Sequence, residues 1–145
     1  MKDLHSGVSV ATLIGAAVLT ADNTPASIDR AGFEAVEIVL AIGAGGITFS
    51  GSNKIEFVLT HSDDDTTYTN VADADLLGVT GTANGIIKAL TSAHAAPASY
   101  RFGYKGGQRY LKLLADFSGT HGTGTPIAAT AILGAAQVAP TANQA

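Results

Sequence analysis

Several stretches of the chain alternate large apolar residues with polar or small residues at every second position. In the clearest stretch, from Phe33 to Ile42, one face carries four large aliphatic residues, namely Val36, Ile38, Leu40 and Ile42. This period of two predicts a half-buried β-strand, because a helix would repeat every 3.6 residues. Burying four such side chains contributes on the order of 6–12 kcal/mol before conformational entropy is subtracted. A polar residue at Ile38 should therefore be tolerated badly.

The same period recurs along the chain, and turn-forming residues separate the segments. Further strands are expected over residues 8–21, 54–61, 67–71, 85–90, 98–104, 109–117 and 127–138. Residues 47–49 are either a short strand or part of a long hairpin connection, and residues 72–77 could form a helical turn. Polar side chains at 61–66 and glycines at 106–107 favour chain reversals. About eight strands without a βαβ pattern predict an all-β fold, an antiparallel β-sandwich or barrel.

Length and composition predict one folded domain over residues 1–145, with a flexible arm over about 1–7 and a tail over about 139–145. Of the 145 residues, 46% are hydrophobic and only 14% are charged, which does not suit a disordered chain. The net charge of −4 with eight Lys and Arg residues makes a nucleic-acid partner a poor expectation. With no cysteine, disulfides, thiolate zinc sites and cysteine nucleophiles are excluded.

The segment from Val8 to Ala21 is the most hydrophobic part of the chain. It spans about 14 residues and contains polar breaks, whereas a membrane span needs about 20 apolar residues, so no membrane association is expected. Asp3 in the head region and the sequence Leu19-Thr20-Ala21 fit a signal peptide poorly. We interpret the segment as a strand or arm that pairs either within its own sheet or with a neighbouring subunit.

Two groups of residues are candidate metal ligands. Five acidic residues lie close in sequence, Asp63, Asp64, Asp65, Asp73 and Asp75, but they lack the spacing of a calcium loop. Four histidines, His5, His61, His94 and His121, are dispersed without metal-ligand spacing. We expect a solvated acidic turn and no metal or cofactor.

No pattern of catalytic residues stands out. The glycine-rich stretches at residues 43–46 and 119–124 lack the Lys-Ser/Thr ending of a phosphate loop, so they are interpreted as turns. No Gly-x-Ser-x-Gly nucleophile elbow is present. We therefore expect that the protein is not an enzyme and predict no catalytic residue.

Aromatic side chains offer one alternative, a carbohydrate-binding module. Tyr100, Phe102 and Tyr104 fall on one face of their strand, where they could stack on sugars, with Tyr100, Tyr104 and Tyr110 as the platform. Aromatic alternation on a strand is more often part of a core.

Two segments resemble small structural proteins of tailed bacteriophages. They are residues 61–71 with Asp75-Leu76-Leu77-Gly78, and residues 104–113, followed by a late small-residue strand ending at Leu133-Gly134. Over residues 8–140 the chain is similar to head decoration, or cement, proteins. The resemblance implies a jelly-roll-like β-sandwich that binds the capsid exterior and clamps neighbouring major capsid subunits. It carries over no site residues.

The resulting hypothesis is a virion structural protein on the outside of the head, made in the host cytoplasm. Its expected partners are the major capsid protein and itself, as a homodimer or trimer. A low charge fraction suits a surface covered by neighbours. A tail or head-fibre component is the structural alternative.

Overall fold

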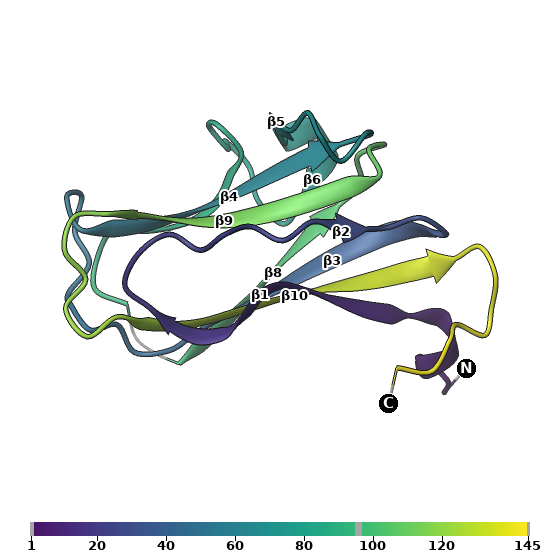
Figure 1. Ribbon diagram of the computed structural model, residues 1–145, viewed down its shortest axis with the longest axis horizontal. Helices are drawn as coiled ribbons and strands as arrows, with labels where there is room; N and C mark the ends of the chain where they lie inside the picture. The colour runs from purple at the N-terminus through teal and green to yellow at the C-terminus, as the bar shows by residue number, and fades with distance from the viewer. Residues whose placement is uncertain (1, 95–96, 145) are drawn as a thin grey trace.

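The computed structural model describes residues 2–94 and 97–144 and is built almost entirely of strands (Figure 1). The elements are η1 (His5–Gly7), β1 (Ser9–Leu19), β2 (Ile28–Asp29), β3 (Phe33–Ile42), β4 (Lys54–Ser62), β5 (Thr69–Asn70), η2 (Asp73–Asp75), β6 (Leu76–Leu77), β7 (Ile86–Leu90), β8 (Ala98–Tyr104), β9 (Tyr110–Ser118) and β10 (Thr125–Ala136). The described segments thus contain ten strands rather than about eight. The additional strands, β2 and β6, have two residues each, too few to show a period in the sequence.

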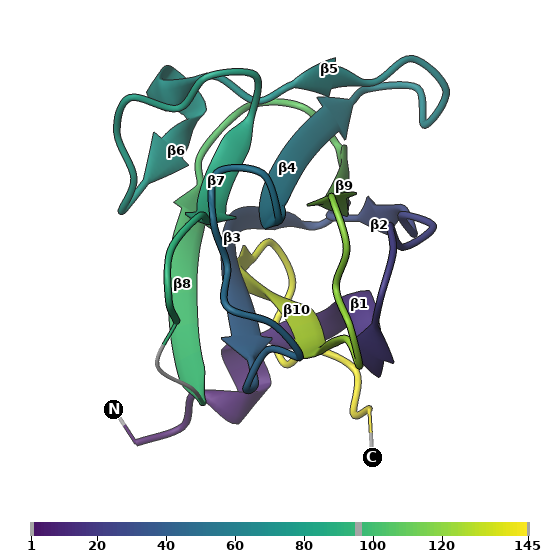
Figure 2. The ribbon, with the colours of Figure 1, turned by 90° about the vertical axis from the view of Figure 1, so that its left-hand side faces the viewer.

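The strands form two antiparallel sheets that face each other (Figure 2). Sheet A has the order β1-β10-β3-β8-β6, and sheet B has the order β2-β9-β4-β5, with β7 also paired to β4. The pairs β1–β10, β2–β9, β3–β8 and β4–β7 show that the second half of the chain returns along the first half. This wrapping is the jelly-roll topology, so the expected antiparallel sandwich is confirmed.

The core lies between the two sheets and is made by the inward residues that the alternation predicts. In β3, Val36, Ile38, Leu40 and Ile42 are all buried. Across the sandwich, β4 contributes Ile55, Phe57 and Leu59, and β9 contributes Leu111, Leu113 and Ala115. The inward face of β8 is aromatic, since Phe102 and Tyr104 are buried. Period-two burial in both sheets closes one shared core.

Strand β1 departs from simple alternation. Its pairing with β10 shifts between Thr12 and Ile14 and again between Ile14 and Ala17. Each shift places one extra residue in β1, which is a β-bulge. As a result Leu13 and Ile14 are adjacent and both buried, whereas strict alternation would put them on opposite faces. The segment pairs within its own sheet, which answers the question left open by the sequence.

The connection from β3 to β4 contains no strand. Residues 47–49 are irregular, but Phe49 is 3% exposed and joins the core. The helical turn expected before Gly78 is present as η2.

Segments close to the two ends of the described chain contact each other, namely residues 6–10 and residues 141–144. The Thr141 N–H donates to the Ser6 carbonyl at 3.0 Å, and the Thr141 hydroxyl donates to the Val8 carbonyl at 2.8 Å. Met1 and Ala145, the outermost residues of the expected arm and tail, lie outside the described residues. No helix among the described residues is long and apolar enough to cross a membrane.

Candidate interaction surface

The outer face of sheet A is almost free of charge. The pairing registers place on this face Val10 and Thr12 of β1, Ala128, Thr130, Ile132 and Gly134 of β10, Ala35, Glu37, Val39 and Ala41 of β3, and Ser99, Arg101 and Gly103 of β8. Small side chains dominate, so the backbone of the sheet lies close to the surface. A surface of this kind can approach another protein closely with little loss of side-chain entropy.

The two charges on this face neutralise each other. The Arg101 guanidinium lies 3.5 Å from the Glu37 carboxylate. The Arg101 side chain is 83% exposed, so the pair contributes little to folding. Its effect is to leave the face without net charge.

One end of the face is hollowed. A shallow apolar depression of about 390 Å³ lies over β1, β10, β3 and the start of β8. Its lining includes Val18, Ala41, Gly43, Pro97 and Pro126. A Cβ atom on Gly43 would lie 2.8 Å from the Pro126 side chain, so glycine keeps the two strands close there. The depression could hold an apolar side chain of a partner.

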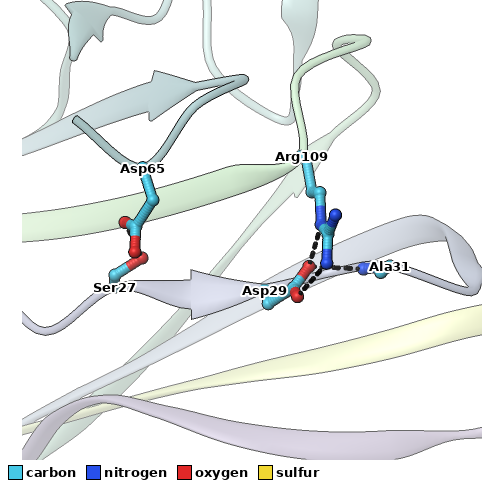
Figure 3. A network of polar contacts seen from close by, with 5 residues as sticks. All are labelled: Ser27, Asp29, Ala31, Asp65 and Arg109. Carbon is cyan, nitrogen blue, oxygen red and sulfur yellow. Dashed lines mark hydrogen bonds and ion pairs between the residues drawn. The ribbon is translucent and has the colours of Figure 1, made fainter. Parts of the chain in front are cut away.

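The outer face of sheet B is different, because charges and loops of the same chain occupy it. Lys54 and Glu56 form an ion pair at 2.8 Å, and Lys112 lies 4.0 Å from the centroid of the Tyr68 ring. In β2, Asp29 receives two hydrogen bonds from Arg109, at 2.8 and 2.7 Å (Figure 3). These bonds lower the pKa of the Asp29 carboxyl and raise the pKa of the guanidinium.

The carboxylates of the acidic residues accept hydrogen bonds from nearby loop residues. Asp64 accepts the backbone N–H groups of Thr66 and Thr67, which together with Ser62 lower its pKa to about 2. Asp65 instead accepts the hydroxyl of Ser27, which lies beside it in Figure 3, and also the hydroxyl of Tyr68. Within residues 2–94 and 97–144, no group of three potential ligands could hold a metal ion. The expected turn is present at residues 63–67, and its carboxylates hold loops in place.

Asp73 has a similar role in a neighbouring loop. Its carboxylate accepts the N–H groups of Gly81 and Thr82 at 2.6 and 2.8 Å. This contact ties η2 to the loop that precedes β7.

His61 joins the two sheets through a buried hydrogen bond. Its Nδ1 lies 2.9 Å from the Tyr104 hydroxyl, and that hydroxyl accepts the N–H of Gln108 at 3.2 Å. The hydroxyl keeps its own proton, which it can donate to Nδ1 of a neutral imidazole. Burial lowers the pKa of His61 and outweighs the attraction of Asp75 and Asp63 for the charged form.

His94 and His121 are brought together by the fold in a way that sequence spacing does not reveal. Both rings lie beside Phe49, with centroid distances of 6.5 and 6.3 Å. His121 also packs edge-on against Phe117 at 4.6 Å, and its Nε2 lies 2.9 Å from the Ser118 carbonyl. The cluster closes one end of the core. His5 is exposed in η1.

The three tyrosines do not form a carbohydrate platform. Tyr104 is 2% exposed and faces the core. Tyr100 packs against the core on the same strand of sheet A, whereas Tyr110 belongs to β9 in sheet B. The expectation that the aromatic residues of β8 belong to the core is confirmed. The alternative that these three tyrosines form one sugar-binding platform is wrong.

The glycine-rich stretches at 43–46 and 119–124 are loops, as expected. They also contact each other, since the Gly46 N–H donates to the Gly124 carbonyl at 2.7 Å. Gly124 has φ of +88°, a conformation that glycine adopts without strain. The two loops close the end of the sandwich that carries the apolar depression.

No protein-family model matches the chain, and no curated protein matches it. Among solved structures, the chain is similar to one described as "SPBc2 prophage-derived protein YomS", with a TM-score of 0.44 and 15% sequence identity. The alignment covers 87% of this chain and 91% of that one.

Proposed function

We propose that the protein is a structural component of a tailed-bacteriophage virion that binds the outside of the head and clamps neighbouring major capsid subunits. The neutral outer face of sheet A is the observation that supports this proposal. Interface centres are depleted in charge, and on this face the lone acid and lone base pair with each other. The sequence resemblance over residues 8–140 supplies the kind of partner.

Weak contacts are sufficient for such a role. A symmetric shell presents many copies of each subunit, and a self-associating decoration protein engages several of them at once. The mechanism is mechanical reinforcement and requires no catalytic residue.

The test is rebinding of the purified protein to heads of its phage that lack it. Ala41→Glu with Ser99→Glu puts two carboxylates at the hollowed end of the sheet A face, where the two exposed residues are cross-strand neighbours. We expect this variant to lose binding, measured by co-sedimentation with shells. The matched control is Thr69→Glu with Asn70→Glu on β5, which is exposed on sheet B.

The control variant should bind as the unaltered protein does. Equal binding by all three proteins, or no binding by the unaltered protein, would overturn the proposal. A tail or head-fibre position is the alternative outcome, and immunogold labelling of intact particles distinguishes it by location.

A further inference from the structure

Strand β1 is an edge strand of sheet A, and no other strand pairs with its outer side within the described residues. Among the described residues it pairs only with β10, and Figure 1 shows it at the border of sheet A. Edge strands usually carry lysine, proline or bulges that prevent pairing with other chains. β1 has two bulges, but its sequence Ser-Val-Ala-Thr-Leu-Ile-Gly-Ala-Ala-Val-Leu contains neither a charged residue nor proline.

The free backbone groups of Val10 on this edge already form hydrogen bonds with a side-chain amide. The Val10 N–H donates to Oε1 of Gln144 at 2.8 Å, and Nε2 of Gln144 donates to the Val10 carbonyl at 2.9 Å. A residue of a neighbouring strand would make the same two hydrogen bonds. The Val10 groups therefore point away from β10, and the side chain of Gln144 occupies a position that another strand could take.

Two exposed valines lie near the ends of the same strand. Val10 is 48% exposed and Val18 is 60% exposed. They pair with Ile132 and Pro126 of β10, which places both valines on the outer face of sheet A. Each lies four residues from Ile14, the central residue of β1.

We propose that β1 pairs with β1 of a second copy of this chain, antiparallel about a two-fold axis at Ile14. Val10 of one copy then lies opposite Val18 of the other, and Gln144 gives way to the incoming strand. The bulges interrupt the ladder between Thr12 and Ala17, so the pairing is concentrated at the two ends that carry the valines.

The symmetric placement of the two exposed valines about Ile14 favours a second copy as the occupant, and charge does not oppose it. The chain carries a net charge of −4, so two copies repel each other wherever charged surfaces meet. The uncharged β1 edge avoids that repulsion, and a two-fold axis makes the edge complementary to itself. The proposed function includes self-association of the protein, and this inference rests on it only because it assigns a surface to that self-association.

Cross-linking tests the register directly, because the chain contains no cysteine. Val10→Cys mixed with Val18→Cys should form a disulfide-linked dimer under mild oxidation, seen as a band at twice the 14.6 kDa of one chain. Val10→Cys alone should not, because the two-fold axis holds the two copies of that residue apart. No cross-link in the mixture, or equal cross-linking by Val10→Cys alone, would overturn the proposal.

Charge substitution tests the same register without covalent chemistry. Val10→Lys with Val18→Lys places like charges opposite each other and should weaken the dimer at least about tenfold in sedimentation equilibrium. Val10→Glu with Val18→Lys creates two cross-pairs and should stay within about threefold of the unaltered dimer. The control is Leu77→Lys, at an exposed position (54%) on the opposite edge strand of sheet A, β6, and it should leave the dimer unchanged.

A dimer that tolerates both lysines would overturn the inference. A protein that is monomeric in solution yet binds shells would overturn this inference alone. A β1-paired dimer that fails to bind shells would overturn the proposed function alone.

Discussion

The two sheets share one core but present opposite kinds of outer face. Sheet A exposes small uncharged residues around a single self-neutralising pair, Glu37 and Arg101. Sheet B exposes Lys54, Glu56 and Lys112, and loop residues such as Tyr68 pack over it. The chain thus uses its own side chains to cover one sheet and leaves the other bare. A bare, neutral sheet face is where a partner can bind at low desolvation cost.

The largest expected effect separates the inner and outer sides of sheet A on one strand. Ile38 is 0% exposed, whereas its neighbour Val39 points outward and is only partly buried. Ile38→Asn should lower the free energy of unfolding by about 3–5 kcal/mol, through lost burial and an amide without partners. Val39→Asn should cost less than about 1 kcal/mol. Denaturant titration of both variants measures the difference, and equal losses would contradict the assigned faces.

A smaller loss is expected where the two sheets are joined by polar atoms. Tyr104→Phe removes the hydroxyl that contacts His61 Nδ1 and accepts the Gln108 N–H. One buried and one partly buried polar group are left without this partner, so the variant should be about 1–3 kcal/mol less stable. Tyr100→Phe is the matched control, because the Tyr100 hydroxyl makes only a long contact of 3.4 Å with His94. A Tyr104→Phe variant as stable as that control would contradict the joining role.

The alternation of residues predicted most of this architecture, and its failures have identifiable causes. Strands such as β3 and β9 were predictable because each has a complete period of two along one sheet. The bulges of β1 were not, since they depend on its register with β10, a strand more than a hundred residues away. The same applies to His94 and His121, which meet at Phe49 only after three loops converge. The neutral face required knowing which strands are neighbours, and local sequence does not contain that information.

Acid should weaken two contacts in separate pH windows, namely the His61 contact between the sheets and the Asp64 turn that follows β4. The pKa of His61 is lowered by burial, so below the usual histidine value of about 6.5 the unfolded chain binds a proton that the folded chain resists. The stability that depends on the neutral His61 imidazole is complete above about pH 6.5 and is lost as the pH falls below that value. Asp64, with a pKa of about 2, favours folding above about pH 4 and loses that effect toward pH 2. Thermal unfolding measured against pH should show both steps, and His61→Phe should remove only the upper one.

The smallest effect on stability should distinguish the two faces most sharply. Glu37→Gln or Arg101→Gln breaks an exposed contact of 3.5 Å, so each should change the free energy of unfolding by less than about 0.5 kcal/mol. Each nevertheless leaves an unpaired charge on the sheet A face, which a partner must desolvate on binding. Shell binding should therefore weaken several-fold in each single variant and recover in the double variant, where neither charge remains.

Glu56→Gln on sheet B should leave shell binding unchanged, although its ion pair with Lys54 is shorter, at 2.8 Å. Recovery in the double variant is the decisive result, because a direct contact of either residue with the shell would make the two losses add.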